Sequence, residues 1–80
     1  MKYINFKKDE HVTLRTIADK IDELRSDGHT HEILVQVQGN SEEIYQLQKD
    51  LWHGLMQMSQ VETLDQDLLM LTFRTVVHNL

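Results

Sequence analysis

The chain contains neither cysteine nor proline among its 80 residues. Without cysteine it forms no disulfide bridge and offers no thiolate to a metal ion or a substrate, so its core depends on apolar burial. A reducing compartment fits this composition, and we expect a cytoplasmic protein. A domain of this size buries only about 60 to 65% of the surface that its unfolded chain exposes. Its stability margin is therefore thin, and association with a partner would add to it.

Long apolar runs are also lacking, since the longest run has four members, Leu68 to Leu71. No segment reaches the length of a signal-peptide core or a membrane span. No repeat, linker or low-complexity tract interrupts the chain, which has only three glycines. These features predict one soluble domain over residues 1–80 that does not associate with a membrane.

The whole chain carries a formal net charge of −5. Basic residues are scarce after its first third. Residues 27–80 contain two basic groups, Lys49 and Arg74, against eight acidic ones. Such a surface repels phosphate backbones and attracts basic partners. Glu42, Glu43 and Asp50 form the candidate acidic surface for a partner. The alternative is that these charges only keep a small domain soluble.

The first half of the chain shows both strand and helix periodicity. Residues alternate between two faces at Tyr3–Lys7 and at Glu32–Gln38, one face apolar and the other polar or, in the second segment, mostly polar with Leu34, which predicts two strands. Between them, the apolar residues of Val12–Asp27 are spaced to form one helical stripe. Thr13 is the expected N-cap of this helix, and Gly28 suits the left-handed position after its end.

A second helix is predicted from Asn40 and Glu43, which resemble a capping box, to about Ser59. Its inner stripe is apolar: Ile44, Leu47, Leu51, Leu55 and Met58. A second stripe widens the apolar arc beyond what one helix contact needs: Tyr45, Trp52 and Met56. Such aromatic residues belong to the core in most helices and anchor interfaces in others. Val61–Leu64 is a short strand or an extended link, and Asp65–Asp67 is a turn.

The final strand-like segment, Leu68–Val77, is apolar on both of its faces. The resulting order, β-α-β-α-β with or without a terminal hairpin, predicts a single α+β domain with a three- to four-stranded sheet. Right-handed crossovers make the strands on either side of each helix parallel and place both helices on one face of the sheet. The other face is then bare.

The bare face is expected to mark an interface. Its predicted side chains are nearly half apolar: Tyr3, Asn5, Lys7, Leu34, Gln36, Gln38, Leu68, Met70, Thr72, Arg74 and Val76. Four of them, Tyr3, Leu34, Leu68 and Met70, are predicted to form a contiguous patch larger than a monomer usually exposes. A second copy of the chain is the expected occupant, so we predict a homodimer.

Two other interpretations of this face stay open. In one, the chain itself covers the second side of a central final strand. In the other, the sheet faces of a dimer enclose a small-ligand or enzymatic pocket near Tyr3, Met70 and Arg74.

Motifs for catalysis and for metal binding are lacking as well. His29 and His31 would share one face of a strand, but no second cluster supplies the further ligands that zinc needs. His53, beside Trp52, is the best candidate for a general acid or base. No serine lies in a nucleophile elbow, and no glycine-rich loop could cradle a phosphate. We therefore expect no catalytic residue, no metal and no cofactor.

The predicted function is that of a non-enzymatic regulatory or inhibitory module, dimeric, that binds a basic protein. A nucleic-acid-binding protein is the natural candidate partner, and phage-encoded mimics of nucleic-acid charge have compositions of this kind, although −5 is modest for a mimic. Direct nucleic-acid binding is not expected. The alternative is weak nucleic-acid binding through the basic cluster Lys2, Lys7 and Lys8 at the first strand.

Overall fold

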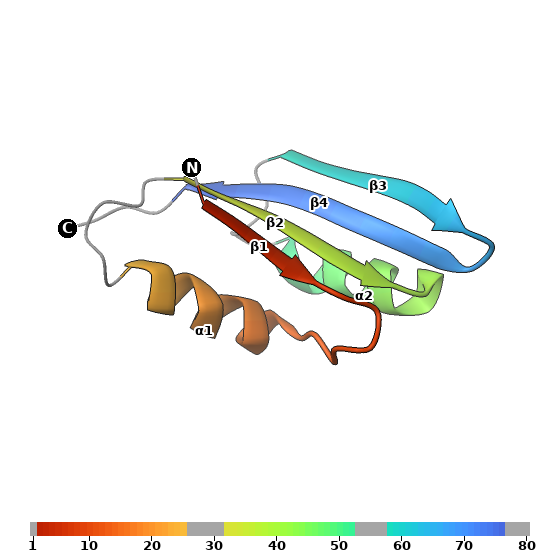
Figure 1. Ribbon diagram of the computed structural model, residues 1–80, viewed down its shortest axis with the longest axis horizontal. Coiled ribbons are helices and arrows are strands. Elements are labelled where there is room, and N and C mark those ends of the chain that lie inside the picture. Colours follow the sequence, from red (N-terminus) through yellow and green to blue (C-terminus); the bar gives the residue numbers. More distant parts are fainter. Residues whose placement is uncertain (1, 26–31, 53–57, 77–80) are drawn as a thin grey trace.

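The computed structural model describes residues 2–25, 32–52 and 58–76. In chain order the elements are β1 (Lys2–Phe6), α1 (Leu14–Arg25), β2 (Glu32–Gly39), α2 (Ser41–Leu51), β3 (Met58–Asp65) and β4 (Leu68–Val76). Figure 1 shows both helices on one side of the sheet. The prediction of a small α+β domain is confirmed. No helix in the described ranges is long and apolar enough to cross a membrane.

The strands form one mixed sheet in the order β1-β2-β4-β3. β1 and β2 are parallel neighbours, while β4 is antiparallel to both β2 and β3. β2 and β3 therefore point the same way, joined by a crossover through α2, and β4 lies between them. As a result β4 is an inner strand, and β1 and β3 are the two edges of the sheet.

Side-chain caps explain where the helices begin. Thr13 Oγ1 accepts a hydrogen bond from the Thr16 N–H at 3.3 Å, so Thr13 caps α1 as predicted. At α2, Asn40 Oδ1 accepts from the Glu43 N–H at 2.9 Å, and Glu43 Oε1 accepts from the Asn40 N–H at 3.4 Å. This reciprocal pair is the predicted capping box. Gly28 lies outside the described residues.

The core lies between the sheet and the helices. The strand residues that alternate with those of the predicted bare face are buried: Ile4, Phe6, Ile33, Val35, Val37, Leu69, Leu71 and Phe73. The helices add the buried residues Ile17, Ile21, Ile44, Leu47 and Leu51. α2 packs against β2 and β4 and touches α1. The opposite face of the sheet has no helix over it in the part of the chain that is described.

The second helix is shorter than predicted. It ends at Leu51 rather than near Ser59, and both Met58 and Ser59 belong to β3. Met58 therefore does not extend the inner stripe of the helix, because its backbone pairs with β4 instead. Five residues of the predicted helix, positions 53–57, lie outside the described residues, Leu55 and Met56 of the predicted stripes among them. For Val61–Leu64 the strand interpretation is confirmed, and the strand is longer than predicted.

Candidate functional site

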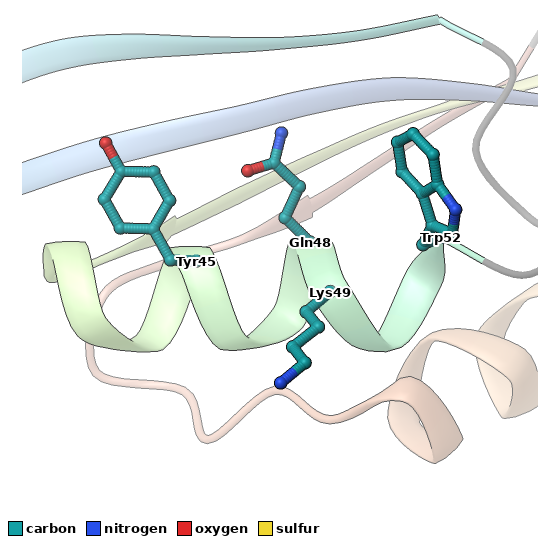
Figure 2. A pocket seen from close by; sticks show the side chains of 4 residues that line it. All are labelled: Tyr45, Gln48, Lys49 and Trp52. Carbon is teal, nitrogen blue, oxygen red and sulfur yellow. The ribbon is translucent and has the colours of Figure 1, made fainter.

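Two large aromatic side chains of α2 and its C-terminal cap lie in solvent. Trp52 is 75% exposed and Tyr45 is 59% exposed. They are two helical turns apart, so they project from the same side of the helix with Gln48 between them. Figure 2 shows these three side chains on one side of α2 and Lys49 on the other. Together the four residues line an open depression of about 660 Å³. Tyr45, Gln48 and Trp52 are called the aromatic flank below.

The aromatic flank is turned toward the β3 edge of the sheet. The opposite flank of α2, at Glu43 and Asp50, lines a depression with His11 and Thr13, which lie just before α1. α1 therefore occupies that side of α2. In Figure 2 the aromatic flank lies on the side where β4 and β3 run, away from α1.

β3 has no helix beneath it among the described residues. Three of its side chains, Ser59, Val61 and Thr63, point to the same side of the sheet as their buried β4 partners: Phe73, Leu71 and Leu69. Ser59 and Thr63 are nonetheless exposed, and Val61 is only half-buried. On the helix side of the sheet, side chains are thus buried on β4 and largely exposed on β3. The uncovered side of β3 and the aromatic flank therefore border the same space beside α2.

The bare face of the sheet is divided by a polar row. One residue from each strand contributes to that row: Asn5, Gln36, Thr72 and Gln60. On one side of it, Tyr3 pairs with Leu34, which lies opposite Arg74. Tyr3 is 64% exposed on the edge strand, and Leu34 is half-buried at the centre.

The other two apolar residues lie on the far side of the polar row. Met70 lies between Gln38 on β2 and Glu62 on β3, with Leu68 two residues before it. The prediction of one contiguous apolar patch is therefore wrong, because the amide and hydroxyl side chains of the central row separate its two halves. Periodicity assigns each residue to a face, but only the strand register places it along that face. The role of these residues in an interface stays a prediction.

Arg74 is engaged in an ion pair on the bare face. Its Nε lies 2.9 Å from Oε1 of Glu32, and both side chains are partly exposed, so the pair adds little stability. A depression of about 240 Å³ reaches Arg74 and is lined by Leu34, Ser59, Gln60, Thr72, Phe73 and Arg74. Neither Tyr3 nor Met70 is among these residues, so the predicted ligand pocket is matched only at Arg74. An anionic ligand there would have to compete with Glu32.

The acidic candidates on α2 do not form one surface. Glu43 completes the capping box, and Asp50 Oδ1 accepts a hydrogen bond from Gln46 Nε2 at 3.0 Å. These two residues lie on the flank toward α1, whereas Glu42 is about 100° around the helix from Glu43. Lysine at position 43 would remove a cap contact as well as a charge. Glu42 and Asp50 are therefore the better positions for testing whether this charge attracts a partner.

A second acidic group lies on β3 and its hairpin to β4: Glu62, Asp65 and Asp67. Between Lys49 and Arg74 the chain contains no lysine or arginine. Lys8, from the predicted basic cluster, lines a depression of about 400 Å³ with Glu43, Asp65 and Asp67. Part of that cluster is therefore surrounded by carboxylates, which disfavours binding of a phosphate backbone there.

Histidines are the candidates in the sequence for metal binding and acid–base chemistry. They contain no group of three or more His, Cys, Asp or Glu side chains that could hold a metal ion. His29, His31 and His53 lie outside the described residues. Comparison of the chain with protein-family models, with curated proteins and with solved structures gives no match.

Proposed function

We propose that this domain is a non-enzymatic protein-binding module whose contact surface is the aromatic flank of α2. The observation that carries the proposal is the exposure of Trp52 and Tyr45, 75% and 59%, beside a core that closes without them. Their position is not explained by stability, because neither side chain is needed to fill the space between helices and sheet.

Aromatic side chains in this setting provide binding energy on contact. Burying what Trp52 and Tyr45 leave exposed would contribute on the order of 5 kcal/mol before the entropic cost of association. Tryptophan and tyrosine are enriched at the centres of protein interfaces because a rigid ring brings a large contact area together with a polar tip. Gln48 lies between them and adds a side-chain amide that can donate and accept hydrogen bonds.

The charge of β3 and its hairpin, the strand edge toward which the aromatic flank is turned, favours a basic partner. Glu62, Asp65 and Asp67 lie there, and β3 itself contains no lysine or arginine. Opposite charge at the rim of an interface speeds association and makes it sensitive to salt. A nucleic-acid-binding protein is the natural candidate because its own surface is basic. The module would then regulate or inhibit that protein by occupying its surface.

Two tyrosines provide a matched test of this proposal. Tyr45 and Tyr3 have similar exposure, 59% and 64%, but lie on opposite faces of the molecule. We expect the immobilised wild-type chain and the Tyr3→Ala variant to retain the same basic protein at low salt, and the Tyr45→Ala variant to lose it. The retained protein is identified by mass spectrometry, and its affinity for each purified variant is then measured by calorimetry. Equal affinities of the wild type and Tyr45→Ala would contradict the proposal.

Homodimerisation through the bare sheet face is the second candidate. It is favoured by the placement of both helices on one face, which leaves Leu34 half-buried at the centre of a face that no described element covers. If this face is a dimer interface, light scattering on a dilution series should give twice the mass of one chain.

The Leu34→Glu variant should dissociate such a dimer. Position 34 lies opposite Arg74, so a glutamate there is tolerated in the monomer, whereas in a dimer it would carry a charge into the interface. A wild-type mass equal to one chain at all concentrations, or a Leu34→Glu variant that stays dimeric, would remove this candidate.

A further inference from the structure

The two edges of the sheet differ in how well they are protected. β1 is a short edge, Lys2–Phe6, and lysines stand at its start and directly after it at positions 7 and 8. β3 is a longer edge, Met58–Asp65, that contains no lysine, no arginine and no proline. Its only irregularity is a register shift between Thr63 and Asp65, next to the hairpin. Proteins usually block long edges with lysine, proline or central bulges, because unpaired N–H and C=O groups recruit another strand.

The surroundings of β3 would give an added strand two different environments. A strand paired with β3 would lie about 4.8 Å further out and so would not be blocked by the body of α2, which packs under β2 and β4. Side chains on its helix side would enter the space bordered by the aromatic flank and Val61. Side chains on its other side would lie beside Gln60 and Glu62, which point to the bare face.

We propose that an extended, basic segment of a partner protein adds to the free edge of β3 as a fifth strand, with every second side chain apolar. The alternation follows from the two environments: the apolar side chains pack toward Trp52 and Tyr45, and the lysines or arginines between them lie near Glu62. Main-chain hydrogen bonds to β3 provide the register, and the two rows of side chains provide the selectivity. This inference rests on the proposed function and specifies how its partner is recognised.

Charge disfavours a second copy of the chain as the occupant. Two antiparallel β3 strands paired at Val61 would place both copies of Glu62 diagonally across the same face, and β3 offers no basic residue to balance them. Like charges at such short range oppose pairing. A basic segment would instead place a positive charge beside Glu62.

The test uses the peptide acetyl-Lys-Val-Lys-Val-Lys-Val-Lys-amide with the complete chain. We expect it to bind and to slow hydrogen exchange at β3 amides that do not pair with β4. The same peptide with glutamate in place of lysine should not bind. Two forms methylated at backbone nitrogens of alternate residues keep all side chains but each block one hydrogen-bonding edge. At least one of them should fail to bind.

Three variants separate the contributions of the β3 edge, the aromatic flank and the overall charge of the chain to peptide binding. Glu62→Lys should weaken peptide binding several-fold, and Trp52→Ala should weaken it about tenfold or more. Asp19→Lys makes the same change of charge on exposed α1 and should leave binding unchanged.

Several outcomes would overturn strand addition. Three results would do so and leave the proposed function standing. They are unchanged exchange at β3, undiminished binding of both methylated forms, and no peptide binding by a chain that still captures a partner through Tyr45. Dimers of the chain that Glu62→Lys dissociates would show that the occupant is a second copy. Loss of binding on methylation without any effect of Trp52→Ala would support the added strand and contradict the role of the flank.

Discussion

Replacing Phe73 with alanine is expected to remove a large part of the domain's free energy of unfolding. Phe73 is fully buried on the inner strand β4, where it lies between Val35 on β2 and Ser59 on β3. Truncation of a buried phenylalanine costs about 3–5 kcal/mol, because apolar contacts are lost and the cavity closes only in part. A domain of 80 residues has a total stability of about 4–12 kcal/mol. The variant would therefore lose a large fraction of its stability.

Urea unfolding followed by circular dichroism is the appropriate measurement for Phe73→Ala. Fluorescence is a poor probe, since Trp52 is already 75% exposed in the folded chain and its surroundings change little on unfolding. The midpoint should fall by about 2–4 M urea, or the variant should be unfolded without urea. Tyr3→Ala is the aromatic control and should shift stability by no more than about 0.5 kcal/mol. A small shift for Phe73→Ala would mean that β4 is not central to the core.

The buried side of the fold could be predicted because it follows a repeating pattern. Ile33, Val35 and Val37 occupy every second position of β2, and all three are buried on the side of the helices. The Asn40 and Glu43 spacing likewise indicated a cap, since that geometry is local to one turn of helix. Both signals depend on short stretches of chain, which a sequence displays directly.

β3 could not be bounded in the same way because it is exposed on both faces. Ser59, Gln60, Glu62 and Thr63 are all exposed, so no alternation of apolar and polar residues marks this strand. Its pairing with β4 is a contact between chain segments, set by the two-residue hairpin after Asp65 rather than by its own hydrophobicity. The helical spacing that placed Met58 in α2 therefore had no competing signal.

In the sequence, the aromatic flank was indicated only by an apolar arc on the second helix that is wider than one helix contact needs. Tyr45 and Trp52 each follow a residue of the buried stripe, Ile44 and Leu51, and this offset of about 100° moves them to the side of the helix. Whether another element covers that arc depends on the position of β3 and on which of the described helices lies beneath it. Those facts belong to the tertiary structure.

The Trp52→Ala variant should lose affinity for the partner and keep its free energy of unfolding. The indole is 75% exposed, so its removal leaves no cavity and should change the free energy of unfolding by no more than about 0.5 kcal/mol. Trp52 is also the C-cap of α2, but it caps through its main-chain N–H, which donates to the Lys49 carbonyl oxygen at 3.3 Å and is retained in alanine. Partner affinity should fall by about 2–4 kcal/mol, or roughly 30- to 1,000-fold, as at other tryptophan hot spots.

The conservative variant Trp52→Phe distinguishes contact area from a specific polar contact. Phenylalanine keeps most of the ring surface but lacks the indole N–H, so it should restore most of the affinity if burial of the ring dominates. Calorimetric titration of the captured partner with wild type, Trp52→Ala and Trp52→Phe, beside their urea curves, gives both quantities for each chain. Equal affinity of all three would exclude the flank from the interface. A large stability loss in Trp52→Ala would instead assign the indole to the fold, because an exposed anchor has no stabilising contact to lose within its own chain.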